Sequence, residues 1–243
     1  MLEMQAVGFV LSARRFGESG AIVDVFTRTH GRFKGLVRGG AGKKMRPLLQ
    51  AGNTLSVTWR ARLSDHLGHF TVEAEDLIAG RFLGIPSCLN AILSLTELLA
   101  VTPERQAYPR LYDTAKLVLD HLDDPQTWPA LMVRFEMALL AEMGFGLDLS
   151  RCAATGVTTD LTYVSPKSGC AVSAGAASPY LDRLFPLPRF LVDVSSTPEP
   201  QDIANGFALI GHFLDRRVLQ PNGRALPEVR ARMMAHFSAS ASI

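Results

Sequence analysis

The sequence is poor in cysteine and has no long apolar runs. Its three cysteines, Cys88, Cys152 and Cys170, form an odd and sparse set, which argues against a disulfide framework and for a reducing compartment. No stretch reaches the about 18 uninterrupted apolar residues that a membrane span needs. The N-terminus has no basic stretch ahead of its short apolar run, so it does not resemble a secretory signal. We therefore expect a soluble, cytoplasmic protein.

Motifs for catalysis, nucleotide binding and metal binding are also missing. The six histidines are scattered without an H-x-x-x-H pair, and there is no G-x-S-x-G nucleophile elbow. The glycine-rich segment 38–46 is not a P-loop, because Gly42 and Lys43 are followed by Lys44 rather than by Ser or Thr. These absences favour a binding protein over an enzyme, and they predict no cofactor.

The residues that are present predict a folded α+β protein. Hydrophobic residues make up 47% of the 243 residues, and the mean hydropathy is +0.14. In the first 80 residues, apolar and polar side chains alternate with the period of two that is typical of strands. Because no helix-length crossover separates these segments, the pattern favours a small barrel over an α/β sheet. The segments are 7–11, 22–26, 32–38, 54–60 and 70–75.

After residue 80 the apolar residues recur at the three- and four-residue spacing of amphipathic helices. We expect helices at 91–101, 108–122, 131–143 and 202–219, with a loop-rich insert over about 150–200. The sequence therefore predicts two domains, a β-module over 1–80 and a helical domain over 81–243.

Positive charge is concentrated in the N-terminal part of the chain. The first 62 residues hold eleven Lys or Arg and three acids, a formal charge of +8 (11 − 3), whereas the rest holds 14 basic and 20 acidic residues. This density on one small module is typical of a polyanion-binding surface, although a merely solvated basic surface remains the alternative. The predicted binding residues are Arg14, Arg15, Arg32, Lys34, Arg38, Lys43, Lys44, Arg46, Arg60 and Arg62.

Aromatic side chains could add base stacking to this surface. Small barrels often bind single strands by combining a positive groove with aromatic platforms. Phe16 and Phe33 lie beside basic residues and are the candidates for exposure, with core packing as the alternative. The other aromatic residues of the barrel alternate with polar neighbours and are assigned to the core.

At several ordered segments the chain resembles the RecO family of bacterial recombination and repair proteins. No single motif is diagnostic, but the order of the matches over about 1–190 is fairly specific. The matching segments include Ile22-Val-Asp-Val-Phe-Thr27, His30-Gly-Arg-Phe-Lys-Gly-Leu-Val-Arg38, Thr96-Glu-Leu-Leu99, Arg134-Phe-Glu136 and Tyr163-Val-Ser-Pro-Lys-Ser-Gly169.

The resemblance implies an oligonucleotide-binding (OB) barrel followed by an α-helical bundle. It also implies a non-enzymatic, nucleoid-associated protein that binds single- and double-stranded DNA and anneals complementary strands. By the same resemblance the partners are RecR and the C-terminal tail of single-strand binding protein, and RecA is loaded indirectly in a RecF-type pathway. The ten basic residues named above are then DNA-binding residues.

The chain departs from the family pattern in the insert. Many members carry a zinc-ribbon-like knob with two Cys-x-x-Cys pairs, but the corresponding positions here are Cys152, Thr155, Cys170 and Ser173. Half of the thiolates are thus replaced by hydroxyls, which are poor zinc ligands at neutral pH. We expect no zinc, and we expect Leu161, Tyr163 and Val172 to hold the insert together.

Two other functions remain open at this stage. An RNA-binding barrel fits the charge pattern equally well, because phosphates do not distinguish RNA from DNA. Alternatively, the protein is an adaptor whose helical domain, with Arg105, Arg110 and Arg134, binds protein partners while the barrel is structural.

Overall fold

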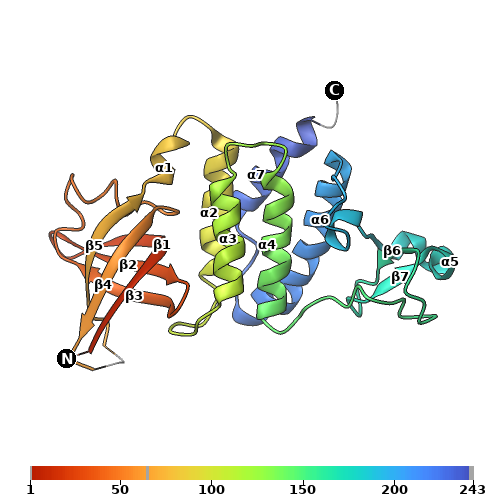
Figure 1. The fold of residues 1–243 in the computed structure, drawn as a ribbon, viewed down its shortest axis with the longest axis horizontal. Coiled ribbons are helices and arrows are strands. Elements are labelled where there is room, and N and C mark those ends of the chain that lie inside the picture. Colours follow the sequence, from red (N-terminus) through yellow and green to blue (C-terminus); the bar gives the residue numbers. More distant parts are fainter. Residues whose placement is uncertain (1, 64–65, 241–243) are drawn as a thin grey trace. The chain divides into compact units, whose positions relative to one another are not determined.

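The alternating segments of the N-terminal region form five strands that close into a barrel. The strands are β1 (Leu2–Phe16), β2 (Gly20–Thr27), β3 (Gly31–Val37), β4 (Thr54–Ala61) and β5 (His69–Asp76). In the computed structural model, which describes residues 2–63 and 66–240 (236–240 as backbone only), their order is β1-β2-β3-β5-β4 (Figure 1). All neighbouring strands are antiparallel except β3 and β5, which are parallel. The predicted five-stranded module is confirmed.

The first strand is longer than predicted, and its length closes the barrel. Its N-terminal part pairs with β4 and its C-terminal part pairs with β2. A register shift between Val10 and Ser12 marks an irregularity of the kind that bends a strand from one neighbour to the next. The sequence pattern predicted only 7–11, although Leu2, Met4 and Ala6 also alternate with Glu3 and Gln5 at the start of the strand.

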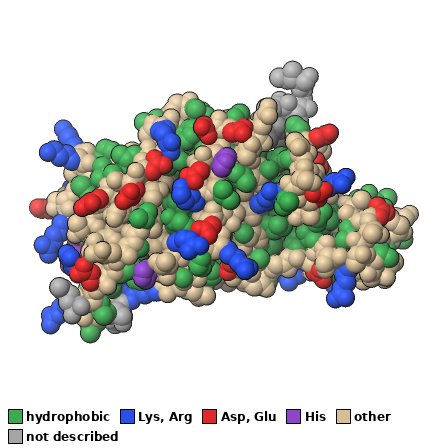
Figure 2. All heavy atoms as spheres, viewed as in Figure 1, with side chains coloured by type: hydrophobic (Ala, Val, Ile, Leu, Met, Phe, Trp, Pro, Cys, Tyr) green, Lys and Arg blue, Asp and Glu red, His purple; other side chains and the backbone are tan. Residues whose placement is uncertain are grey.

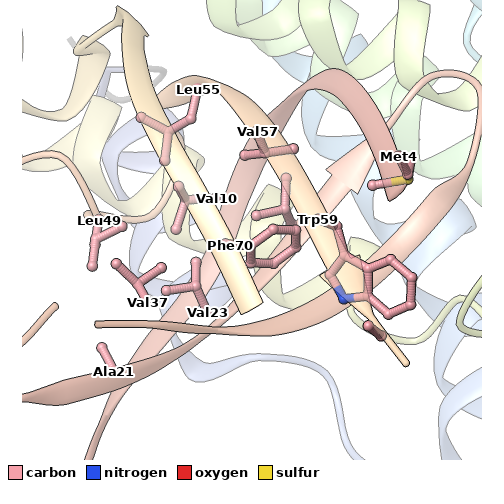
Figure 3. Packing of buried hydrophobic residues seen from close by; sticks show 12 residues of the cluster. Met4, Val10, Ala21, Val23, Val37, Leu49, Leu55, Val57, Trp59 and Phe70 are labelled. Carbon is pink, nitrogen blue, oxygen red and sulfur yellow. The ribbon is translucent and has the colours of Figure 1, made fainter. Parts of the chain in front are cut away.

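The barrel interior is filled by the apolar members of the alternating pattern. Trp59 and Phe70 contribute the largest side chains, and both are buried. Figure 3 shows these rings among the aliphatic residues that surround them. The buried cluster consists of Met4, Val10, Ala21, Val23, Val25, Val37, Leu49, Leu55, Val57, Trp59, Ala61 and Phe70.

Three helices complete the first compact unit, which ends at Asp120. They are α1 (Ile78–Arg81), α2 (Pro86–Leu99) and α3 (Pro109–Asp120). The ring of Tyr112 on α3 stacks on Phe9 of β1, with centroids 4.4 Å apart, and lies 6.3 Å from the ring of Phe26 on β2. Part of the predicted helical region thus packs with the barrel, and the domain boundary near residue 80 stays a prediction.

The second compact unit begins at His121 and contains two helical layers and the insert. Its helices are α4 (Trp128–Glu142), α6 (Pro200–Phe213), the π-helix η3 (Leu214–Leu219), the 3-10 turn η4 (Gln220–Asn222) and α7 (Glu228–Ser240). The insert contains strands β6 (Leu161–Val164), β7 (Ala171–Ser173) and β8 (Phe185–Pro186), helix α5 (Ala174–Ala177), and the 3-10 turns η1 (Ser178–Arg183) and η2 (Arg189–Leu191). None of the helices in the described part of the chain combines the length and apolar character that a bilayer span requires.

The insert is held by a small apolar cluster of its own. Strands β6 and β7 form an antiparallel hairpin, and β8 pairs with the other edge of β6. Val172 lies in a buried cluster against which Leu161 and Tyr163 pack. The predicted packing of these three residues is confirmed.

A buried ion pair connects α7 to α4 in the second unit. Arg230 donates two hydrogen bonds to the carboxylate of Glu136, at 2.7 and 2.8 Å, and a third to the carbonyl of Phe207 at 2.8 Å. The Glu136 side chain is fully buried and that of Arg230 nearly so. Gly211 leaves space for the guanidinium, because a Cβ at this position would lie 2.9 Å from an Arg230 nitrogen.

We expect Glu136→Gln to lower the free energy of unfolding by about 3 kcal/mol or more, because it leaves a buried guanidinium without its counter-charge. Urea titration measures this loss. Glu142→Gln, at an exposed position of the same helix, is the control and should change stability by less than about 0.5 kcal/mol. Replacing both Glu136 and Arg230 by Met should cost less than Glu136→Gln alone, and equal stability of Glu136→Gln and wild type would contradict the role of the pair.

Candidate nucleic-acid interface

The ten predicted binding residues separate into two groups in the structure. Arg32, Lys34 and Arg60 are engaged by carboxylates, Arg60 through two hydrogen bonds of 2.9 and 3.1 Å to Glu3. The other seven are exposed and form no ion pair with any residue that the structure describes. This second group consists of Arg14, Arg15, Arg38, Lys43, Lys44, Arg46 and Arg62.

The three engaged residues are therefore poor candidates for phosphate contacts. A cation that already binds a carboxylate is largely neutralised, so it gains less from a phosphate than an unpaired cation does. Figure 2 shows Lys and Arg side chains projecting from the outer edge of the barrel (left in this view), with some acidic side chains between them. The exposed group, and not the full set of ten, defines the candidate interface.

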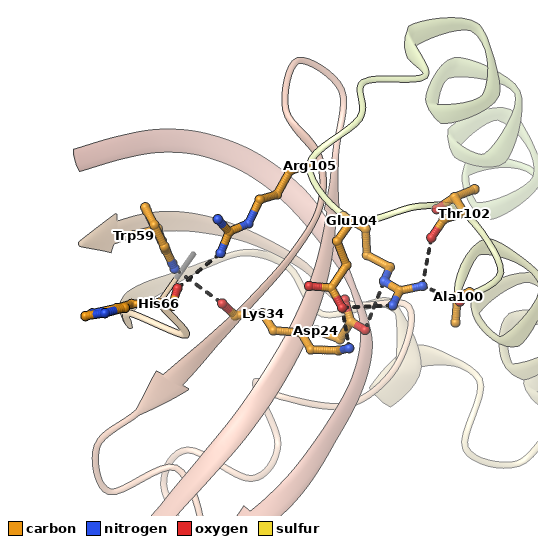
Figure 4. A network of polar contacts seen from close by, with 9 residues as sticks. Asp24, Lys34, Trp59, His66, Ala100, Thr102, Glu104 and Arg105 are labelled. Carbon is orange, nitrogen blue, oxygen red and sulfur yellow. Dashed lines mark hydrogen bonds and ion pairs between the residues drawn. The ribbon is translucent and has the colours of Figure 1, made fainter. Parts of the chain in front are cut away.

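Residues 100–106, which we call the strap, lie along β3 (Figure 4). The strap provides partners for Arg32 and Lys34, whereas Arg60 is bound by Glu3. The Arg32 guanidinium donates to the carbonyls of Ala100 and Thr102, and it contacts Glu104 at 3.1 Å. The same Glu104 carboxylate binds the ammonium of Lys34. Burial raises the pKa of Glu104, but the hydrogen bonds from Lys34 and Arg32 outweigh it and hold that pKa below its usual range. The sequence gives no signal for these contacts, because Glu104 lies about 70 residues from its partners.

The strap also covers the aromatic side chains near β3. The Arg105 guanidinium lies 5.5 Å from the ring centroids of both Phe33 and Trp59, and it donates to the carbonyl of His66 at 3.1 Å. The Arg105 amide donates to the carbonyl of Arg32 at 2.8 Å. Phe33 is half-buried beneath this contact and is not an open stacking platform, whereas Phe16 is 53% exposed at the end of β1.

The strap has consequences for where a nucleic acid can bind. In five-stranded barrels that bind oligonucleotides, strands 2 and 3 usually form the binding face. Here the strap lies on β3, Tyr112 stacks beside β2, and Arg28 at the end of β2 pairs with Asp113 at 2.8 Å. The face that such barrels usually offer to a ligand is therefore occupied by the chain itself.

Six of the seven exposed cations lie instead at the C-terminal end of β1 and on residues 38–53, which we call the basic loop, and Arg62 follows β4. The Ala41 amide donates to the carbonyl of Ser19 at 2.9 Å and so ties the loop to the β1–β2 turn. Leu49 is buried in the barrel core, and the Asn53 side chain donates to the carbonyls of Pro47 and Leu48. The loop is thus anchored at its C-terminal end, while Lys43, Lys44 and Arg46 stay exposed.

A groove of about 870 Å³ runs beside these cations, within the first compact unit. One wall consists of Arg14, Arg15 and neighbouring residues of β1, and another consists of Arg46 and other residues of the basic loop. The third wall is the apolar face of α2, with Leu89, Ile92 and Leu93. The sequence pattern did not reveal this wall, because the three residues resemble ordinary core positions of a helix.

Two family models cover most of the chain. The first, described as "Recombination protein O N terminal", matches residues 1–77, and the second, "Recombination protein O C terminal", matches residues 87–225. A protein named "DNA repair protein RecO" from Methylorubrum extorquens is 50% identical over 234 residues, which cover 94% of this chain and 95% of that protein. The chain belongs to the RecO family.

Two further relatives are also named "DNA repair protein RecO". The protein from Methylobacterium nodulans is 49% identical over 96% of this chain and 97% of its own length. The protein from Beijerinckia indica is 48% identical over 96% of this chain and 94% of its own length. Membership of the RecO family makes the chain a non-enzymatic mediator of DNA recombination and repair, which confirms the predicted family and function class.

The degenerate zinc positions of this RecO-family chain do not fit a zinc ion. Ser173 donates to the sulfur of Cys152 through its amide at 3.3 Å and through its hydroxyl at 3.4 Å. A hydroxyl that donates to a thiolate supports it from outside and does not replace a thiolate ligand. Hydrogen bonds from Ser173 and Thr155 lower the pKa of Cys152 to about 6. No disulfide joins Cys88, Cys152 and Cys170, and the described residues hold no group of three or more Cys, His, Asp or Glu suited to a metal.

Gly31 and Gly17 allow the strap contact to be tested with a matched pair of variants. Both have positive φ, +69° and +62°, so alanine at either position costs about 1–2 kcal/mol of backbone strain. A Cβ on Gly31 would also overlap the carbonyl of Gln106 in the strap, whereas nothing lies within 4 Å of a Cβ on Gly17.

We therefore expect Gly31→Ala to cost about 1–3 kcal/mol more than Gly17→Ala in unfolding free energy. We also expect faster hydrogen exchange of the Arg105 amide in Gly31→Ala alone. Equal stability losses with unchanged exchange would show that the strap does not depend on this contact.

Asp24 makes the stability of the barrel depend on pH. Its side chain is buried beside Arg32 at 3.3 Å, and one carboxylate oxygen has no hydrogen-bond partner among the described residues. Burial raises the pKa of Asp24 to about 6, against the opposing charge of Arg32. Because the folded pKa lies above the unfolded value of 3.8, this carboxyl stabilises the fold below about pH 4, and its contribution is lost as the pH rises through 6.

We expect the stability difference between Asp24→Asn and wild type to shift in favour of the variant as the pH rises from 4 to 7, by up to about 3 kcal/mol. Urea titrations at several pH values measure this difference. Glu18→Gln, an exposed change of the same charge, is the control and should show no such trend. A pH-independent difference for Asp24→Asn would contradict the raised pKa.

Proposed function

We propose that this chain binds single- and double-stranded DNA through the exposed cations at the C-terminal end of β1 and on the basic loop, and that it anneals complementary strands. The observation that carries the proposal is that Arg14, Arg38, Lys43, Lys44 and Arg46 are exposed and form no ion pair with a described residue. We further propose that the barrel is an OB-fold, which is supported by its strand order and its parallel β3–β5 contact.

The proposed mechanism is neutralisation of the DNA backbone. Two strands repel each other through their phosphates, and a basic surface that binds both of them lowers this repulsion without any covalent step. Phosphate contacts carry no sequence information, so binding is largely independent of sequence. Each contact releases counterions, so binding weakens steeply with salt.

The proposed partners rest on family membership. They are RecR, the C-terminal tail of single-strand binding protein and, indirectly, RecA, within a RecF-type pathway. A cytoplasmic, nucleoid-associated location follows from DNA as the ligand. We propose that the protein partners bind the helical domain predicted over 81–243.

Replacing Lys43, Lys44 and Arg46 by Glu should reduce affinity for a single-stranded oligonucleotide by at least tenfold at moderate salt, because contacts are lost and repulsion is added. If all three bind phosphates, the slope of log K against log salt should also become shallower by about 2. Fluorescence anisotropy and annealing of complementary oligonucleotides measure the two effects.

The control carries the same change in net charge in the other compact unit. Arg151, Arg183 and Arg189 of the insert are exposed, and their replacement by Glu should leave affinity within about twofold. Equal loss in both triple variants would indicate a general charge effect. Unchanged affinity of the Lys43, Lys44 and Arg46 variant would reject the basic loop as the site.

A further inference from the structure

We propose that the groove between β1, the basic loop and α2 receives the unpaired bases of a single strand, while the phosphates of that strand lie on Arg14, Arg15 and Arg46. The inference rests on the proposed function and adds to it the place where the bases bind. It also assigns a role to α2, which sequence patterns place in the core.

The first step of the argument concerns the usual binding face. On β3 the cations Arg32 and Lys34 are neutralised by Glu104, and the rings of Phe33 and Trp59 lie under Arg105. A strand bound there would have to displace the whole strap. A strand bound at the opposite end of β3, where the basic loop begins, meets cations that form no ion pair with a described residue, and only Arg15 among its three phosphate contacts donates to backbone carbonyls, those of Gly17 and Glu18.

The second step concerns the chemistry of the groove. A single strand presents an anionic backbone on one side and the apolar faces of its bases on the other. The groove has the complementary arrangement, with Arg14, Arg15 and Arg46 on two walls and Leu89, Ile92 and Leu93 on the third. Leu93 is 39% exposed, and Glu97 is the one carboxylate among the described lining residues. A volume of about 870 Å³ lies within the range of small-ligand sites and holds a base with its sugar.

The third step distinguishes a nucleic acid from an acidic peptide. The cationic surface does not end at the groove but continues along the basic loop through Lys43, Lys44 and Arg38, all exposed. A ligand that uses the groove and this extension together must be a long polyanion with regularly spaced charges. A nucleic-acid strand meets that requirement.

The groove would also discriminate between single strands and duplexes. In a duplex the base faces are stacked inside the helix, so only its phosphates could use the surface. A single strand would gain the additional contact with α2. That contact is apolar and therefore less sensitive to salt than the phosphate contacts.

A tryptophan placed in the groove tests this directly. Leu93→Trp puts an indole on the α2 wall, where a stacked base would quench its fluorescence. Leu117→Trp on α3 is the matched control, because Leu117 is also exposed, at 48%, but does not line the groove. The native Trp59 and Trp128 are buried and contribute the same background to both variants.

We expect an oligothymidylate to quench Leu93→Trp by at least twofold more than Leu117→Trp, with the midpoint that anisotropy gives for binding. A duplex of equal length and an abasic oligomer should bind but cause little quenching.

Equal quenching of both variants, or binding of the oligothymidylate without quenching of Leu93→Trp, would overturn the groove as the site of the bases while leaving DNA binding intact. Quenching by an acidic, apolar-ended peptide but not by the oligonucleotide would overturn it in favour of a peptide site. Absence of any binding to the wild-type chain by anisotropy would reject the proposed function itself.

Discussion

The arrangement of the first unit depends on the double use of Glu104. Its carboxylate binds both Arg32 and Lys34 of β3, and Arg32 in turn holds the carbonyls of Ala100 and Thr102. This one ion network attaches the strap to the barrel and removes two cations from the surface. Because Arg32 is only 12% exposed, its charge needs these partners to remain in the protein. The network therefore decides both how the segment between α2 and α3 is attached to the barrel and which basic residues stay available.

The strands and helices could be predicted from the sequence because burial imposes a period on each of them. The alternation of Leu55, Val57 and Trp59 with polar residues reports the one-sided burial of β4. β2 is different, since Asp24 and Phe26 on its outer face are buried as well. Tyr112 of α3 covers that face, and no local pattern records a cover supplied by a residue some 85 positions away.

The sequence predicted the region of the candidate site but not which of its basic residues are available to a ligand. Arg32 and Lys34 have the same neighbours in sequence as any exposed basic residue, and Arg38 follows them only a few positions later. Arg32 and Lys34 differ from Arg38 because Glu104 binds them, and this contact forms only after folding. The contact of Glu3 with Arg60 likewise forms only after folding. The apolar wall of α2 was missed for the converse reason, because Leu93 has the spacing of a core residue yet is exposed beside the basic loop.

In the annealing function that we propose, cations that lack carboxylate partners would matter, because the protein would have to bind strands and also let them pair. An arginine bound to a carboxylate gains little from a phosphate, since it exchanges one anion for another. An exposed arginine without a carboxylate partner has no anion of the protein to give up, and its contact with a phosphate releases cations condensed on the DNA, which favours binding. Such contacts are numerous, individually weak and independent of sequence, so a strand can shift along them until its complement is in register.

The strap neutralises the β3 cations, so that phosphates would instead contact the exposed lysines of the basic loop. Apolar contact with the bases in the groove would then be confined to unpaired segments, and it would be lost as pairing proceeds. Release of the annealed product is thus a consequence of the same geometry that binds the separate strands.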